Sequence, residues 1–116
     1  YNIIVFSHAP PMGSGLRVLN GLHVKNTCAW LNHAQNNRMR RSFYRAAREH
    51  GSLLAWFSGH FHLAQDYEES ISLLSGNSPG ALTAFCQTGV IGPDSSRDQR
   101  RQSRFLRSNG THLQVY

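Results

Sequence analysis

Two short apolar runs near the start and the middle of the chain predict buried strands. They read "NIIVFS" at residues 2–7 and "SLLAWFS" at residues 52–58, and such unbroken runs of β-branched and aromatic residues are typical of strands covered on both faces. Between them, residues 39–50 place apolar side chains at helical spacing opposite a face of arginines, and Gly51 supplies a stop. The order strand, helix, strand predicts a β-α-β unit with parallel strands and a right-handed crossover.

The second half of the chain contains short strand-like runs separated by turns, a pattern typical of antiparallel structure. The runs "ESISLLSG" and "GALTAFCQTGVIG" predict two strands joined by the turn "GNSPG", and "SRFLRSNGTHLQVY" predicts a hairpin around Asn109-Gly110. Thr27 is a candidate cap for a short helix through "CAWLNHA". A length of 116 residues suits one domain over residues 1–116. We therefore expect an α/β fold (α+β in some schemes), with a β-α-β unit followed by antiparallel strands and a C-terminal hairpin.

Histidines follow both predicted parallel strands. His8 comes after the first strand, and His60 and His62 come after the second. If the segment is extended, His60 and His62 point to one side, and Phe61 packs into apolar surroundings. Ligands of open α/β sheets bind at the carboxyl ends of the strands, and imidazole is a good ligand for Zn, Fe, Mn and Ni. If the strands are neighbours, we expect three imidazoles to converge. The remaining histidines lack such a position: His23, His33, His50 and His112.

The order of these blocks points to a family. "VFSHAPP" followed by "WFSGHFH", with "FCQTGVIG" and the closing hairpin, resembles the last two metal-binding blocks of the calcineurin-like metallophosphoesterases. The resemblance implies a four-layer αββα sandwich with two divalent metal ions, whether Mn, Fe or Zn. It makes His8 and His60 ligands of one ion and His62 a ligand of the other. The implied reaction is hydrolysis of phosphate mono- or diesters by metal-activated hydroxide.

Departures from the family pattern concern its opening blocks. The Asp-x-His, Gly-Asp and Gly-Asn-His blocks, which supply the carboxylate ligands and a general acid, do not occur in these residues. We therefore expect the C-terminal part of such a domain. Its partners would be the missing N-terminal half and a phosphoester substrate. Asp66, Glu68 and Glu69 are the nearest acidic residues, but a charged turn is their expected role.

Three neutral imidazoles offer no charge against two divalent cations, so we expect at most one bound ion and an inactive isolated chain, and we assign no catalytic residue within it. Half of a sandwich also exposes apolar sheet surface.

The charge supports an alternative. The net charge is +6, and the arginines gather in "RMRRSFYRAAR" and "RDQRRQSRFLR", so a nucleic-acid or polyanion-binding module is a second hypothesis. It is less favoured because it leaves the strand-end histidines unexplained. A non-catalytic scaffold relative of the phosphoesterases is a third hypothesis.

No apolar run is long enough to cross a membrane. Cys28 and Cys86 are far apart, form no C-x-x-C motif and have no zinc-ribbon spacing. We therefore expect two ordinary buried thiols, which is consistent with a reducing compartment such as the cytoplasm.

Overall fold

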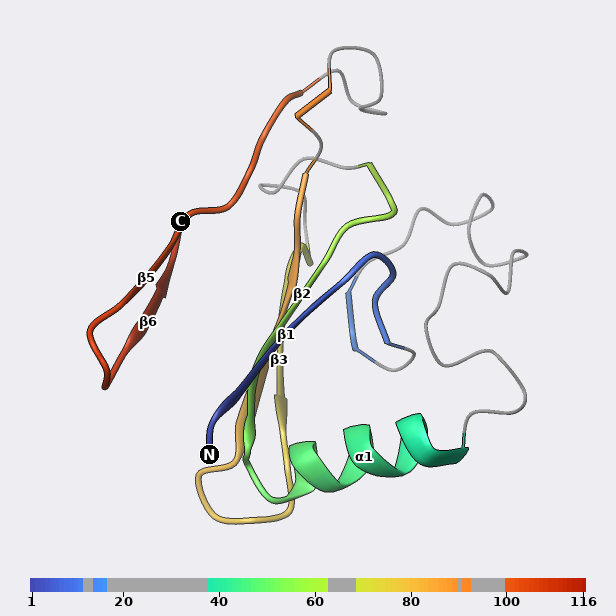
Figure 1. Cartoon of the computed structure of the whole chain (residues 1–116), viewed down its shortest axis with the longest axis vertical. Coiled ribbons are helices and arrows are strands. Elements are labelled where there is room, and N and C mark those ends of the chain that lie inside the picture. The colour runs from blue at the N-terminus through green and yellow to red at the C-terminus, as the bar shows by residue number, and fades with distance from the viewer. Residues whose placement is uncertain (12–13, 17–37, 63–68, 90, 93–99) are drawn as a thin grey trace.

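The protein is a mixed α/β structure in which strands predominate. The computed structural model describes residues 1–11, 14–16, 38–62, 69–89, 91–92 and 100–116. Within these ranges, the elements in chain order are β1 (Ile3–Ser7), α1 (Arg38–Glu49), β2 (Leu53–Ser58), β3 (Ile71–Ser75), β4 (Leu82–Gln87), β5 (Leu106–Ser108) and β6 (Leu113–Val115). The first four strands form one sheet in the order β1-β2-β4-β3, and β5 and β6 form a separate hairpin (Figure 1). The predicted α/β class is confirmed, while a four-layer sandwich needs more strands than these ranges contribute.

Parallel pairing organises the centre of the sheet. β1 pairs with β2 and β2 pairs with β4, both in parallel, whereas β3 and β4 pair antiparallel. The predicted strand, helix, strand unit is therefore confirmed, and so is the antiparallel pair around "GNSPG". Because the three parallel strands run in one direction, their carboxyl ends share one edge of the sheet.

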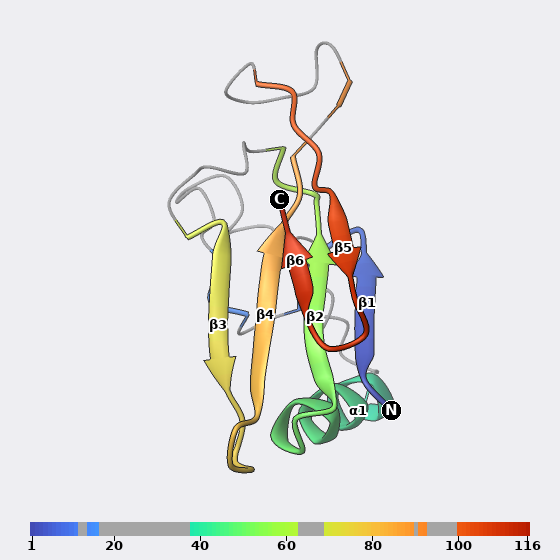
Figure 2. The same ribbon diagram turned by 90° about the vertical axis from the view of Figure 1, so that its left-hand side faces the viewer.

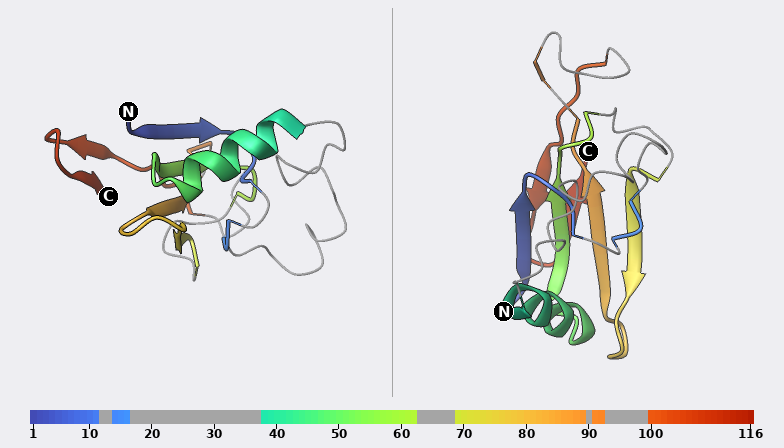
Figure 3. Two further views of the ribbon diagram at one scale, coloured as in Figure 1. Left: turned by 90° about the horizontal axis from the view of Figure 1, so that it is seen from below. Right: turned by 90° about the vertical axis from the view of Figure 1, so that its right-hand side faces the viewer.

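The helix ends where the sequence predicts. The N–H of Gly51 donates to the carbonyl oxygen of Arg48 over 3.1 Å, and Gly51 takes a φ of 75°, a conformation that side-chain-bearing residues rarely adopt. Ala47, near the end of α1, is buried with Leu53 and Trp56 of β2. The helix therefore packs on one side of the lower end of the sheet and extends away from it (Figures 1 and 3). The short helix expected through "CAWLNHA" lies outside the described residues.

The turn between β3 and β4 contacts the end of α1. The N–H of Asn77 donates to Glu49 Oε2, and the N–H of Ser78 donates to the carbonyl oxygen of Glu49, each over 3.1 Å. Gly76 lies so close to this helix end that a Cβ would collide with the carbonyl oxygen of Arg48. The turn and the helix thus fix each other.

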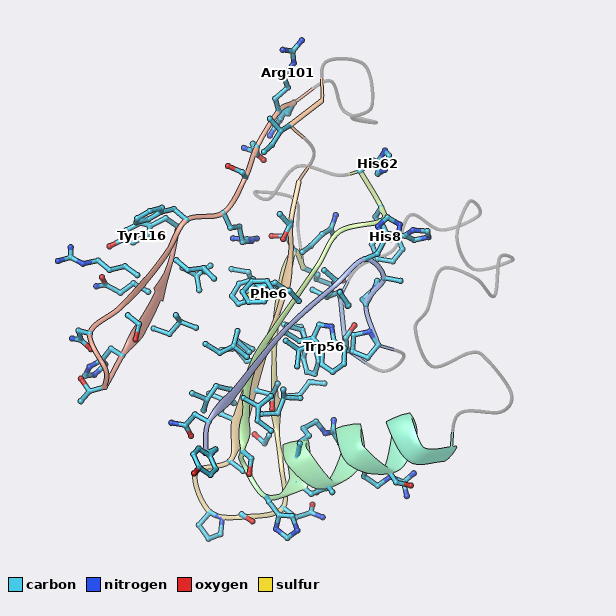
Figure 4. All side chains as sticks on the ribbon, in the orientation of Figure 1. Phe6, His8, Trp56, His62, Arg101 and Tyr116 are labelled. Atoms are coloured by element: carbon cyan, nitrogen blue, oxygen red, sulfur yellow. The ribbon has the colours of Figure 1, made fainter. Side chains whose placement is uncertain are left out.

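The hairpin covers the opposite face of the sheet. Leu106, Leu113 and Val115 pack against a buried cluster of Ala55, Phe57 and Cys86. Figure 2 shows the hairpin in front of β2, with β3 beyond its reach. The labelled side chains of Phe6 and Trp56 point to the two different faces (Figure 4).

Large apolar side chains on the hairpin side remain exposed. Phe6 is 67% exposed although it stacks on Phe57, and Leu73 is 61% exposed. Ile4, Ile71 and Leu82 are also exposed, on strands either side of the area that the hairpin covers. The hairpin is too narrow for this sheet, so the expected exposure of apolar sheet surface is observed.

Two neighbouring leucines of β3 distinguish the covered face from the uncovered one. Leu74 packs against the helix-side core, whereas Leu73 points to the uncovered side. We expect Leu74→Thr to lower the free energy of unfolding by about 1–3 kcal/mol. Leu73→Thr keeps the strand propensity and should change the free energy of unfolding by less than about 0.5 kcal/mol. Urea unfolding of both variants measures this, and equal losses would contradict the assignment of faces.

A substitution at Gly76 tests the contact between the β3–β4 turn and the end of α1. We expect Gly76→Ala to lower the free energy of unfolding by about 1–3 kcal/mol, because the new methyl group meets a backbone oxygen that cannot move independently. Gly59→Ala is the matched control, since the nearest described atoms to its Cβ would be the carbonyl oxygens of His8 and Thr88, each at 3.9 Å. Thermal unfolding of the two variants side by side is the measurement. A tolerated Gly76→Ala would show that the turn does not dock as described.

Candidate metal centre

A row of polar residues ends the three parallel strands. The register pairs Ser7 with Ser58 and Ser58 with Gln87, so the three lie side by side at the same edge of the sheet. Ser58 and Gln87 are each only 1% exposed. His8 follows this row directly, and His60 follows it after Gly59. The strand pairing therefore delivers both histidines to one edge, as the sequence predicts.

His8 and His60 are in direct contact. Nε2 of His8 lies 2.8 Å from Nδ1 of His60, although the two residues are 52 positions apart. The rings meet edge to face, with centroids 4.8 Å apart and an interplanar angle of 82°. Two nitrogens bound to one zinc ion are about 2.9 Å apart at a right angle and about 3.3 Å apart in a tetrahedron, given bonds of about 2.0–2.1 Å. The pair therefore fits one shared metal ion after a shift of a few tenths of an ångström.

The histidine segment is not extended, so the expectation that His60 and His62 point to one side for that reason is wrong. Their φ angles are 74° and 58°, in the left-handed region. The N–H of Phe61 donates to the carbonyl oxygen of Gly59 over 2.9 Å, which closes a γ-turn around His60. Phe61 is fully buried, as expected, because the turn directs it into the protein. A turn of this form is strained, and such strain concentrates at functional sites.

His62 does not join the pair. Its side chain points away from that of His8 (Figure 4), and the described residues hold no group of three His, Cys, Asp or Glu side chains suited to one ion. The expected convergence of three imidazoles is therefore wrong, because the turn at His60 re-aims the backbone before His62. The assignment of His62 to a second ion stays a prediction. Glu69 lies exposed in a turn, and Asp66 and Glu68 lie outside the described residues.

Ser7 and Trp56 support the pair, and the sequence reasoning missed both. The indole N–H of Trp56 donates to Ser7 Oγ over 2.7 Å, and that hydroxyl donates to the carbonyl oxygen of Ala9 over 2.7 Å. The N–H of Gly59 donates to the carbonyl oxygen of His8 over 3.0 Å. These bonds hold the backbone on both sides of His8. The sequence signal for this support is a serine one residue before His8 and another two residues before His60, with a tryptophan in the second predicted strand.

The buried thiol of Cys86 plays no part in this site. Burial raises the pKa of Cys86, and the nearby Arg104 guanidinium opposes that shift only in part. Burial likewise lowers the pKa of Arg104, whose Nε donates to the carbonyl oxygen of Gln87 over 2.6 Å. Cys86 belongs to the hairpin-side core. Its thiol is therefore neutral at pH 7 and is not a candidate ligand or nucleophile.

Ser7 and Ser58 form a matched pair for testing this support. We expect Ser7→Ala to lower the free energy of unfolding by about 1–3 kcal/mol, because the indole N–H loses its acceptor in a partly buried site. Ser58 Oγ is buried with no hydrogen-bond partner among the residues that the structure describes, so Ser58→Ala should be neutral within about 0.5 kcal/mol or stabilising. Chemical unfolding of both variants is the measurement. The reverse ranking would rule out Ser7 as the anchor of the segment.

Comparisons with known proteins add no family assignment. No family model matches the chain, and neither a curated protein nor a solved structure does. Among the residues that the structure describes, no helix has the length and apolar character to span a membrane. The case for a function therefore rests on the residues at the carboxyl edge of the sheet.

Proposed function

We propose that this chain carries part of the metal site of a phosphoesterase, with His8 and His60 as ligands of one divalent ion. The observation that carries the proposal is the 2.8 Å separation between Nε2 of His8 and Nδ1 of His60 at the carboxyl ends of two parallel strands. Two imidazoles in contact at this edge are placed where α/β sheets bind ligands. The motif order around them resembles that of the calcineurin-like metallophosphoesterases.

The residues present fit one ion. Each histidine offers one ring nitrogen toward the other, and hydrogen bonds of Ser7 and Gly59 hold the backbone on both sides of His8. An ion bound there would act as a Lewis acid toward phosphoryl oxygens and would lower the pKa of water. The residues of this chain would hold the ion and fix its position relative to the sheet.

A second ion needs ligands from elsewhere. The imidazoles are neutral, and two divalent cations at short distance require carboxylates to offset their charge. We infer that these carboxylates belong to a further part of the same domain. The exposed apolar side chains on the hairpin side, such as Phe6 and Leu73, support such a part, because they offer it a surface on which to pack. On this proposal the chain alone binds one ion and hydrolyses no phosphoester.

Metal titration tests the ligand pair. We expect the chain to bind one Co²⁺ or Zn²⁺ ion, followed by Co²⁺ absorbance and by calorimetry. His8→Ala and His60→Ala should each weaken binding by more than about tenfold, because each removes one of two ligands. His50→Ala is the matched control, since His50 is an exposed histidine at the end of α1.

The number of bound ions supplies a second readout. Two tightly bound ions per chain, or unchanged affinity in His8→Ala, would contradict the proposal. Hydrolysis of p-nitrophenyl phosphate by the isolated chain at rates above those of the His8→Ala variant would show that the chain needs no further part of the domain.

A further inference from the structure

The hairpin has an outward face that the sheet does not use. Leu106 and Val115 point inward to the sheet, so alternation directs Phe105, Arg107, Gln114 and Tyr116 outward. Phe105 is 66% exposed and Tyr116 is 61% exposed. Their rings lie across the hairpin from each other, with centroids 6.2 Å apart. We call these four residues, together with Asn109 and His112, the outer hairpin face.

A surface pocket lies on the same face of the hairpin, and the Tyr116 hydroxyl contacts one of its lining residues, Gln114. It measures about 250 Å³ and is lined by Arg107, Asn109, His112 and Gln114. Arg107 lies opposite Gln114 across the hairpin, and this is the next outward-facing pair after the aromatic pair on the way to the turn. Stacking surfaces and hydrogen-bonding groups thus lie next to each other on one face.

The turn that closes the hairpin is held in place. Asn109 Oδ1 accepts hydrogen bonds from the N–H groups of Thr111 and His112, over 3.0 and 2.8 Å, and from the Thr111 hydroxyl. Tyr116 donates its hydroxyl proton to Gln114 Oε1 over 3.1 Å, so the amide N–H₂ of Gln114 can donate to a ligand. Because these groups are fixed before a ligand arrives, binding costs little ordering of the loop.

The charge of this region is of one sign. Residues 100–116 contain four arginines and no acidic residue. Arg101 projects from the segment that leads into the hairpin (Figure 4), and Arg107 lines the pocket itself. The ligand that complements this surface is therefore anionic.

We propose that the outer hairpin face binds single-stranded nucleic acid. Unpaired bases stack on Phe105 and Tyr116, and the guanidinium of Arg107 binds a phosphate. The amides of Gln114 and Asn109 face the same pocket, where they donate to base edges. A duplex keeps its base faces stacked, so the exposed rings favour a single strand over a double helix. This site lies on the other side of the sheet from His8 and is independent of the metal proposal (Figure 4).

Fluorescence anisotropy with a labelled twelve-nucleotide RNA and the matching DNA strand tests the aromatic pair. We expect Phe105→Leu and Tyr116→Leu each to weaken binding roughly five- to a hundredfold, because leucine keeps an apolar side chain but removes the stacking surface. Tyr116→Phe should retain the affinity of the parent chain. Phe6→Leu is the matched control, because Phe6 is an equally exposed ring on the large sheet. Circular dichroism confirms that each variant is folded.

The salt dependence tests the arginine. We expect Arg107→Gln to reduce the slope of log affinity against log salt by about 0.7, the value for one phosphate contact with a single strand. Arg45→Gln, at an exposed position of α1, should leave the slope unchanged. His8→Ala should leave oligonucleotide binding unchanged, which separates this proposal from the metal site.

Three results would overturn the proposal. The first is parental affinity in both leucine variants, and the second is a duplex of the same length that binds more tightly than the single strand. The third is equal affinity for phosphatidylserine vesicles or polyglutamate, since either would identify the face as a membrane or acidic-peptide surface.

Discussion

The parallel pairing of β1 with β2 is the constraint on which the rest of the structure depends. It places Ser7 opposite Ser58, and the two following segments then meet at His8 and His60. The same register decides which side chains reach the core. A slip of one residue would move Phe6 to the helix side and displace the imidazoles by about 3.3 Å. Core packing and the candidate metal centre are therefore specified together.

Departures from ordinary local structure gather at the same edge of the sheet. His60 takes a φ of 74° in a γ-turn. Ser58 Oγ and Gln87 Nε2 are buried and have no hydrogen-bond partner within the described part of the chain. Each feature costs stability. Such costs are retained where the geometry serves something other than folding, which agrees with a ligand site at this edge.

The hairpin gives the molecule a second distinct surface. Its inner side chains pack over Phe57 and Cys86. Its outer side carries the two exposed aromatic rings and the arginine that lines the pocket. A strand pair of only three residues each gains little stability alone. Its attachment to the sheet, through the inner leucines and the bond from Arg104 to Gln87, therefore makes the outer face a fixed platform.

Local patterns in the sequence determined the elements, because hydrophobic periodicity, the Gly51 stop and the Asn109-Gly110 turn act over a few residues. They determined the β-α-β unit and the antiparallel pair. That His8 and His60 reach one edge followed only on the condition that the two strands are neighbours, which the pairing of β1 with β2 meets. Only the tertiary structure decided the conformation after β2, because the fully buried Phe61 and the γ-turn around His60 bend the backbone away from the extended path. That bend joins His60 to His8 and sends His62 elsewhere. The hairpin pattern places Phe105 and Tyr116 on adjacent strands, but only the observed register sets the two rings opposite each other.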